Sequence, residues 1–187
     1  MASHEYYEQK SRVNSPRLFL RPMVLSDADL IVSWRNSLVS RSMFFNSEEL
    51  SLVNHVKWFK GHRFNRVDYV FCETSKGKAI GTVNFKNIDE LSGSAEAGKL
   101  LGDISFRKKG LATEAFAAWL QYGFDVLKLK YIYVFTRLDN IANINLNKKL
   151  GFKIVESREN MKPTVKGFIK MEISVEAMDT LNKILLK

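Results

Sequence analysis

Residues 107–114 read RKKGLATE, a basic turn with one glycine that opens directly into a long predicted helix. The first N–H groups of a helix have no partner within it, and the helix macrodipole adds positive charge at the same end. Gly110 lets the backbone approach a bulky anion, and the three cations before it can meet a diphosphate. On its own the stretch is more often a capped helix behind a solvated basic turn.

The segments around this turn predict an α/β (α+β) domain with a mixed central sheet. Strands, identified by period-two alternation or short apolar runs, are expected at residues 17–23, 67–73, 79–86, 95–101, 131–136, 152–158 and 168–175. Helices, identified by 3.6-residue periodicity and caps, are expected at 26–36, 48–63, 110–128, 140–150 and 176–187. Strict βαβα alternation is missing, so the sheet is not doubly wound. We expect an N-terminal tail at 1–15, a polar loop at 87–94 and a single domain over 16–187.

A stripe of asparagine marks the helix predicted at 140–150. Asn140, Asn143 and Asn147 share one helical face, and asparagine is a poor helix former, so the stripe indicates polar contacts. The alternative is an N-cap at Asn140 followed by solvated surface.

Two motifs at the right separation resemble the GNAT superfamily of N-acetyltransferases. The first combines AEAG at 95–98, LGD at 101–103 and RKKGLATE, and is similar to the family signature R/Q-x-x-G-x-G/A as extended in ribosomal-protein N-terminal acetyltransferases. The second combines NIAN at 140–143 with KLGF at 149–152. The resemblance covers about residues 17–175. It implies a GNAT fold, with about seven strands splayed in the middle and four to five flanking helices.

The resemblance also implies acetyl-CoA as cofactor, held in a gap between the strands at 95–101 and 131–136. The strand at 97–101 would bind the pantetheine arm, and the turn would cradle the pyrophosphate. The implied cofactor-binding residues are Ala97, Gly98, Leu100, Leu101, Arg107, Lys108, Lys109, Gly110, Leu111, Ala112, Thr113, Asn140, Asn143 and Asn147.

The resemblance leaves the proton donor open, because Asn147 stands where many GNAT enzymes have a proton-donating tyrosine. Either Tyr133 or an ordered water replaces that donor, or the thiolate leaves unaided. The implied mechanism is direct transfer, in which strand N–H groups stabilise an oxyanion. Glu96 is the candidate base for the attacking amine, directly or through water. The alternative for Glu96 is a surface carboxylate at a strand edge.

Segments before the motif resemble GNAT enzymes that acetylate the 4-amino group of nucleotide-linked deoxysugars, as in the pseudaminic-acid pathway. They read WRNS at 34–37, RSMF at 41–44 and HVKWF at 55–59. Aromatic rings can stack on a base or sugar, and Arg35, Arg41 and Lys57 can meet a diphosphate. The alternative is that Trp34, Phe44, Trp58 and Phe59 belong to the core. The candidate acceptor residues are Arg35, Arg41, Met43, Phe44, His55 and Trp58.

Composition is that of a globular chain of 187 residues with a net charge of +9, which favours an anionic partner. The cations are scattered, so nucleic acid is not expected as a partner. The single cysteine, Cys72, favours a reducing cytoplasmic home and lies in an apolar run, where a small buried side chain is expected. No signal peptide, membrane span or metal site is expected. A homodimer is compatible with the sequence.

Three functions therefore remain open: an amino-sugar-nucleotide N-acetyltransferase, a ribosomal-type or other small-amine acetyltransferase, and a non-catalytic module that binds CoA. The second predicts an acidic or open peptide groove, whereas the first predicts arginines beside aromatic rings.

Overall fold

The computed structural model describes residues 12–43, 48–61, 65–155 and 167–186, whose strands form one mixed sheet of eight in the order β1-β2-β3-β4-β5-β6-β8-β7. Only the β5–β6 pair is parallel, and every other pair in this part of the chain is antiparallel. The strands are β1 (Val13–Asn14), β2 (Leu18–Pro22), β3 (Val67–Glu73), β4 (Ala79–Asp89), β5 (Ser94–Leu101), β6 (Tyr131–Arg137), β7 (Lys153–Ile154) and β8 (Phe168–Ser174).

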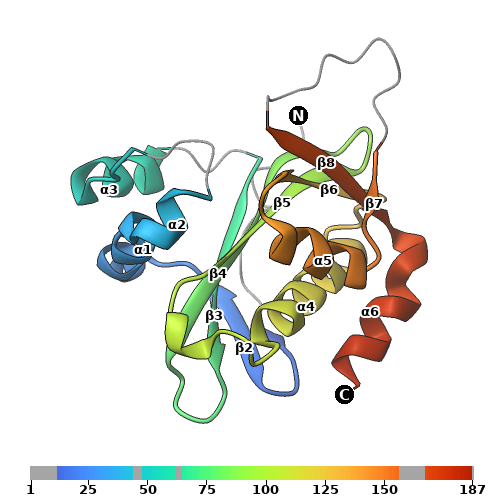
Figure 1. Cartoon of the computed structure of the whole chain (residues 1–187), viewed down its shortest axis with the longest axis horizontal. Coiled ribbons are helices and arrows are strands. Elements are labelled where there is room, and N and C mark those ends of the chain that lie inside the picture. Colours follow the sequence, from blue (N-terminus) through green and yellow to red (C-terminus); the bar gives the residue numbers. More distant parts are fainter. Residues whose placement is uncertain (1–11, 44–47, 62–64, 156–166, 187) are drawn as a thin grey trace.

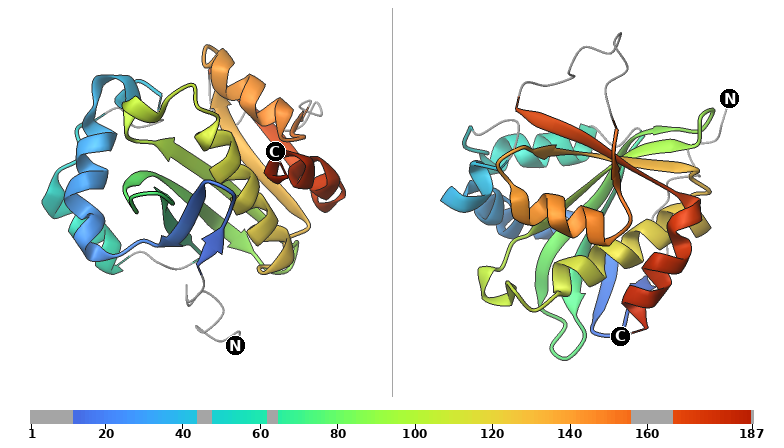
Figure 2. Two further views of the ribbon diagram at one scale, coloured as in Figure 1. Left: turned by 90° about the horizontal axis from the view of Figure 1, so that it is seen from below. Right: turned by 45° about the vertical axis from the view of Figure 1, so that its right-hand side comes forward.

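Helices cover both faces of this sheet (Figures 1 and 2). The group α1 (Ala28–Asn36), α2 (Leu38–Arg41) and α3 (Leu52–Gly61) lies on one side. The group α4 (Leu111–Asp125), α5 (Ile141–Lys149) and α6 (Met178–Leu185) lies on the other. Short 3-10 turns at Leu25–Asp27, Ile104–Phe106 and Val175–Ala177 precede α1, α4 and α6. The predicted mixed α/β fold, of the GNAT type, is confirmed.

The main core lies between the sheet and α4, as the wide apolar surface of that helix predicted. Trp119 is fully buried, and its ring stacks on Phe85 with centroids 4.7 Å apart. A smaller core on the opposite face joins Trp34 of α1 to Val70 and Cys72 of β3. The Cys72 side chain is 1% exposed, as expected of a small buried residue.

The sheet splits between β5 and β6. These strands pair only at Ser94–Tyr131, Ala95–Ile132 and Glu96–Tyr133, so that the rest of β5 has β4 alone as its strand neighbour in the described chain. Alternate residues of a strand point to opposite faces. Ala97, Lys99 and Leu101 therefore face α4 and α5, whereas Glu96, Gly98 and Leu100 face α1 and α3. The predicted separation of the two strands is present.

Several predicted boundaries move. Val13–Asn14 is a strand paired with β2, so the tail expected at 1–15 joins the sheet at its end, and residues 1–11 lie outside the described chain. The loop expected at 87–94 shrinks because β4 continues to Asp89 past an irregularity in register. The strand expected at 152–158 is described only at Lys153–Ile154 and to residue 155, with 156–166 outside the described residues.

The first two helices also differ from the prediction. The cap expected at Ser26 forms instead at Val24, whose N–H donates to Asp27 Oδ2 at 2.9 Å while Arg21 binds both oxygens of that carboxylate. The helix expected at 48–63 spans Leu52–Gly61, and the one buried side chain described in it is His55. Of the predicted apolar face, Phe59 packs against the smaller core, whereas Leu52 is exposed.

Candidate functional site

The turn before α4 has the backbone geometry of an anion cradle. Lys108 and Gly110 both adopt left-handed conformations, with φ of 60° and 77°, and Gly110 is the N-cap residue of α4. The Gly110 carbonyl accepts from Thr113 and Glu114, each at 3.1 Å. Leu111 and Ala112 precede Thr113 at the start of α4. Their N–H groups therefore lie at the helix N-terminus, ahead of the first helical hydrogen bonds, which is where helices bind phosphate.

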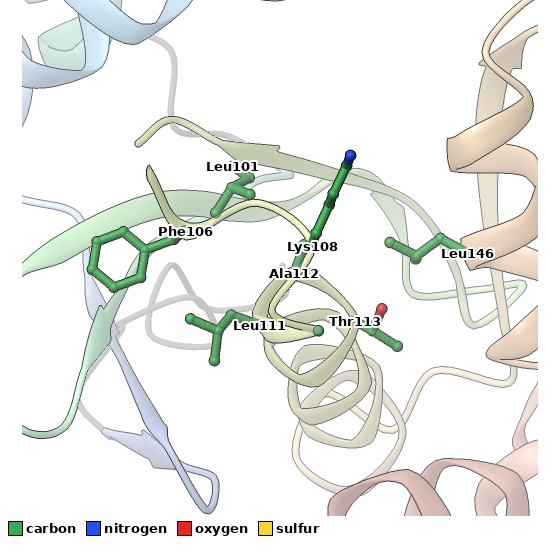
Figure 3. A pocket seen from close by; sticks show the side chains of 8 residues that line it. Leu101, Phe106, Lys108, Leu111, Ala112, Thr113 and Leu146 are labelled. Carbon is green, nitrogen blue, oxygen red and sulfur yellow. The ribbon is translucent and has the colours of Figure 1, made fainter. Parts of the chain in front are cut away.

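A pocket of about 240 Å³ opens at this turn (Figure 3). Leu146 reaches it from α5, opposite Leu101 of β5, while Lys108 rises beside Leu101. Its lining residues are Leu101, Phe106, Lys108, Gly110, Leu111, Ala112, Thr113 and Leu146. Arg107 and Lys109 are also exposed at the turn, and Lys109 Nζ lies 4.9 Å from the centroid of the Phe106 ring. The structure therefore brings the predicted turn residues together around one cavity.

Glu114 fixes this turn to the N-terminal strands. Its carboxylate is buried and accepts from Ser15 Oγ at 2.8 Å, Arg17 N–H at 2.8 Å and Arg17 Nε at 2.7 Å. The same arginine donates from Nη1 to the Lys109 carbonyl at 3.0 Å. Arg17 thus spans from the first turn of α4 to the anion cradle, which the sequence pattern alone did not reveal.

We expect Glu114→Ala to lower the free energy of unfolding by about 1–3 kcal/mol, because three donors lose a buried acceptor. The Arg17 side chain is 55% exposed, so water replaces part of the lost ion pair. Urea unfolding measures the change. Asp139→Ala is the control, since the Arg137–Asp139 pair is exposed and should contribute much less to stability. Equal losses in the two variants would contradict the proposed anchoring by Glu114.

The asparagine stripe of α5 turns inward rather than to solvent. Asn140 caps the helix by accepting from Asn143 N–H at 3.1 Å, while Asn143 and Asn147 each donate from Nδ2 to Thr136 Oγ1, at 3.2 and 3.1 Å. Asn147 is 0% exposed. Asn140 is therefore the N-cap of the helix, as one alternative predicted. Asn143 and Asn147 are not solvated surface residues, because both bind Thr136.

Lys99 of β5, which the sequence did not single out, completes this group. Its Nζ donates to Asn147 Oδ1 at 2.7 Å and lies 4.0 Å from the centroid of the Phe116 ring. Burial lowers the pKa of Lys99 to about 7. The ammonium therefore sits beyond the last β5–β6 pair, where the strands have separated.

Glu96 and Tyr133 lie on the other face of the sheet. They are register partners, and the Glu96 carboxylate accepts from Lys86 Nζ at 2.8 Å and Asn87 Nδ2 at 3.1 Å. Burial, together with the charge of Glu96, raises the pKa of Tyr133. Tyr133 faces away from Thr136, the partner of Asn147, so the structure does not bring the two predicted donor positions together.

A cationic and aromatic cluster occupies the face with Glu96. His55 is 6% exposed and stacks on Trp58 with ring centroids 5.2 Å apart. The Arg66 guanidinium lies 4.8 Å from the Trp58 centroid and pairs with Asp68 at 2.7 Å. Burial and the charge of Arg66 lower the pKa of Arg35, and burial and the charge of Arg35 lower the pKa of His55. Arg35 and Arg66 thus lie in one site, where Arg66 is paired with Asp68.

Two buried polar atoms on this face lack a protein partner among the described residues: His55 Nε2 and Asn84 Oδ1. Asn84 lies against Gly98, where an added Cβ would come within 2.9 Å of its Oδ1. Buried polar atoms are normally hydrogen-bonded. These two atoms are therefore available to a ligand bound between α3 and β5.

The other predicted acceptor residues differ in their burial. Trp34 is core, as the alternative held, and Phe59 packs against the same cluster. Arg41 is partly buried in α2, while Met43 and Lys57 are exposed. Phe44 lies outside the described residues. Arg66, Asp68 and Asn84 escaped the sequence analysis, although polar residues beside the apolar runs of β3 and β4 were a visible signal.

Comparison with known proteins identifies the chemistry. The acetyltransferase (GNAT) domain model matches residues 17–153. A Bacillus licheniformis protein named uncharacterized N-acetyltransferase p20 is 32% identical over 146 residues, covering 73% of this chain and 79% of that protein. An uncharacterized Methanocaldococcus jannaschii protein is 26% identical over 160 residues, covering 82% of this chain, which spans only 32% of that longer protein.

Solved structures agree on the fold. A spermidine N-acetyltransferase of Vibrio cholerae in complex with CoA and spermine gives a TM-score of 0.76 at 22% identity, covering 87% of this chain and 98% of that one. Apo FdhC, a nucleotide-linked sugar GNAT, gives 0.77 at 16% identity, covering 95% and 99%. None of the described helices has the length and apolar character needed to cross a bilayer.

Proposed function

Because the chain belongs to the GNAT acetyltransferase family, we propose that it acetylates the 4-amino group of a nucleotide-linked amino-deoxysugar. The family makes it an N-acetyltransferase, and the cofactor of the family is acetyl-CoA. The two solved relatives differ in acceptor, since one holds spermine and the other is described as acting on nucleotide-linked sugars. At their low identities, the choice between these acceptor classes rests on the chemistry of the acceptor face.

The cofactor half of the proposal rests on the α4 turn. Left-handed Lys108 and Gly110, the helix N-terminus and the pocket beside Leu101 fit a diphosphate joined to an extended arm. The unpaired edge of β5 at residues 97–101 offers backbone groups to that arm. Bound acetyl-CoA would supply a thioester to the gap between β5 and β6.

The acceptor half rests on one observation: Arg35 and Arg66 lie close enough to affect each other, beside Trp58 and His55. His55 Nε2 has no hydrogen-bond partner among the described residues. Such a site attracts a diphosphate, which arginine binds well, and an aromatic face for a base or sugar. Spermidine is a polycation, and the same charges would repel it. Charge complementarity therefore favours the nucleotide sugar.

Glu96 faces this cluster and is the proposed base. Asn87 and Lys86 each occupy one carboxylate oxygen, and each oxygen retains a further acceptor position. The carboxylate can thus take the proton from the attacking amine through a water, a contribution of about 10²–10⁴ in rate.

A thiol-release assay with acetyl-CoA tests the acceptor. The panel contains UDP- and dTDP-4-amino-4,6-dideoxysugars, ribosomal N-terminal peptides and spermidine, and we expect turnover of an amino-sugar nucleotide alone. Turnover of spermidine or peptides instead would overturn the assignment while leaving the cofactor site intact.

Arg35→Met gives the matching prediction. Loss of this cation should raise KM for the nucleotide sugar about 10–100-fold, roughly 1.4–2.7 kcal/mol, with KM for acetyl-CoA unchanged. The pKa of His55 should rise, because Arg35 no longer opposes its protonation, and NMR titration detects this without substrate. Arg137→Met is the control, since its partner Asp139 is exposed. An unchanged acceptor KM in Arg35→Met would contradict the site.

A further inference from the structure

Lys99 is a partly buried titratable group that the mechanism above leaves unused. Its Nζ contacts Asn147 Oδ1 at 2.7 Å, and Asn147 is held in turn by Thr136 Oγ1 at 3.1 Å. This chain of contacts crosses from β5 to α5 to β6 at the point where β5 and β6 separate, between α4 and α5 (Figure 1). The asparagine amide can orient an ammonium but has no proton of suitable acidity to give.

The position of Lys99 along the gap is set by its neighbours. Leu101, two residues on, and Leu146, the residue before Asn147, both line the pocket at the α4 turn. A ligand with its diphosphate on that turn and its arm along β5 therefore extends toward Lys99. Glu96 projects from the same strand to the opposite face. The gap thus has a carboxylate on the acceptor side and an ammonium on the helix side.

We propose that Lys99 donates a proton to the sulfur that leaves during acetyl transfer, and that Asn147 positions its ammonium. The step rests on the acetyltransferase activity and not on the identity of the acceptor. The acceptor nitrogen forms the new C–N bond with its lone pair, and the C–S bond breaks with its electron pair leaving on sulfur. Lys99 Nζ gives one proton to that sulfur and regains one from water, while the proton lost by the amine passes through water to Glu96.

The acidity of Lys99 suits this role. Burial lowers its pKa to about 7, against about 8.5 for an ordinary thiol, so transfer from the ammonium to the thiolate is downhill near neutral pH. An unperturbed lysine would hold its proton more tightly than the thiolate, and arginine more tightly still.

Other charged groups on the surrounding elements are engaged elsewhere or exposed. Val83 is the β4 register partner of Lys99 and carries no charge. On α4, Glu114 binds Arg17; on β6, Arg137 binds Asp139; on β8, Lys170 and Glu172 bind each other; on α5, Lys148 and Lys149 are exposed. The titration near neutral pH on this side of the gap is therefore assigned to Lys99.

The first test uses CoA alone and so is independent of the acceptor. Ultraviolet absorbance of the thiolate, followed against pH in the protein–CoA complex, reports the pKa of the bound thiol. We expect this pKa to lie below that of free CoA by about 1 or more in Lys99→Arg, whose cation keeps its charge throughout the titration. In the wild type the pKa of the bound thiol should fall by less, because Lys99 loses its own proton in the same pH range. Lys99→Met should lose the effect, and the exposed control Lys148→Met should keep it. Identical titrations in wild type and Lys99→Met would overturn the proposal.

The second test separates charge from proton donation. With the amine that the panel identifies, Lys99→Met and Lys99→Arg should both lower kcat about 10²-fold or more, with KM for acetyl-CoA little changed. In the wild type, kcat should fall as pH rises above the pKa of Lys99, and this limb should vanish in both variants. Full activity in Lys99→Arg, or a mass gain of one acetyl group on Lys99 without acceptor, would overturn the donor role.

Discussion

Gly110→Val should abolish acetyl-CoA binding. Gly110 has a φ of 77°, a conformation that costs an ordinary residue about 1–2 kcal/mol and a β-branched one more. A steric clash of the new side chain is not the cause, since the heavy atom nearest to an added Cβ is Arg17 Nη2 at 3.5 Å. The strain therefore falls on the backbone, and relieving it reorients the N–H groups that would cradle the diphosphate.

Isothermal titration of CoA measures this effect, and we expect affinity to fall at least about 100-fold, or 2.7 kcal/mol. Gly77→Val is the matched control: Gly77 has a φ of 67° in the turn between β3 and β4, with no described heavy atom within 4 Å of the added Cβ beyond the excluded neighbours. It should cost similar stability and leave CoA affinity unchanged. Gly110→Asn should retain more affinity than the valine, because asparagine tolerates a positive φ. Wild-type affinity in Gly110→Val would refute the turn as the cofactor site.

Local signals predicted the turn before α4 and the helix that follows it. Gly110, which follows three cations and precedes an apolar helical stretch, allows the tight turn that the sequence predicts. The helix after it has so wide an apolar surface that it must pack against a sheet. The asparagine stripe likewise indicated polar contacts before Thr136 was known as their partner. These features depend on residues near one another in sequence.

The acceptor half and Lys99 could not be predicted in the same way, because tertiary contacts decide them. His55 is buried in a helix whose periodicity favoured Leu52, Val56 and Phe59, since Asp68 and the arginines make that part of the sheet polar. Lys99 resembles an ordinary solvated strand residue in the sequence. It becomes partly buried because β5 leaves β6 and the Lys99 side chain reaches Asn147 of α5.

Gly102→Ala should strongly destabilise the fold, through the contact between α1 and the end of β5. An added Cβ would lie 2.0 Å from Cδ2 and 2.3 Å from Cγ of Trp34, which is a buried indole. The Gly102 N–H also donates to the Ile80 carbonyl at 2.9 Å, so the backbone cannot move aside without losing that bond. Overpacking of this kind costs about 3 kcal/mol and should lower Tm by about 6–12 °C.

A double-mutant cycle with Trp34→Leu tests whether this clash is the cause. Trp34→Leu alone should destabilise the protein by leaving a cavity, but in the Gly102→Ala background the smaller side chain should recover part of the lost stability. Gly61→Ala at the end of α3 is the control, because no described heavy atom lies within 4 Å of its added Cβ beyond the excluded neighbours. Arg35 follows Trp34 directly, so displacement of the indole should also raise the acceptor KM. Additive effects in the cycle would show that Gly102 and Trp34 are not in steric conflict.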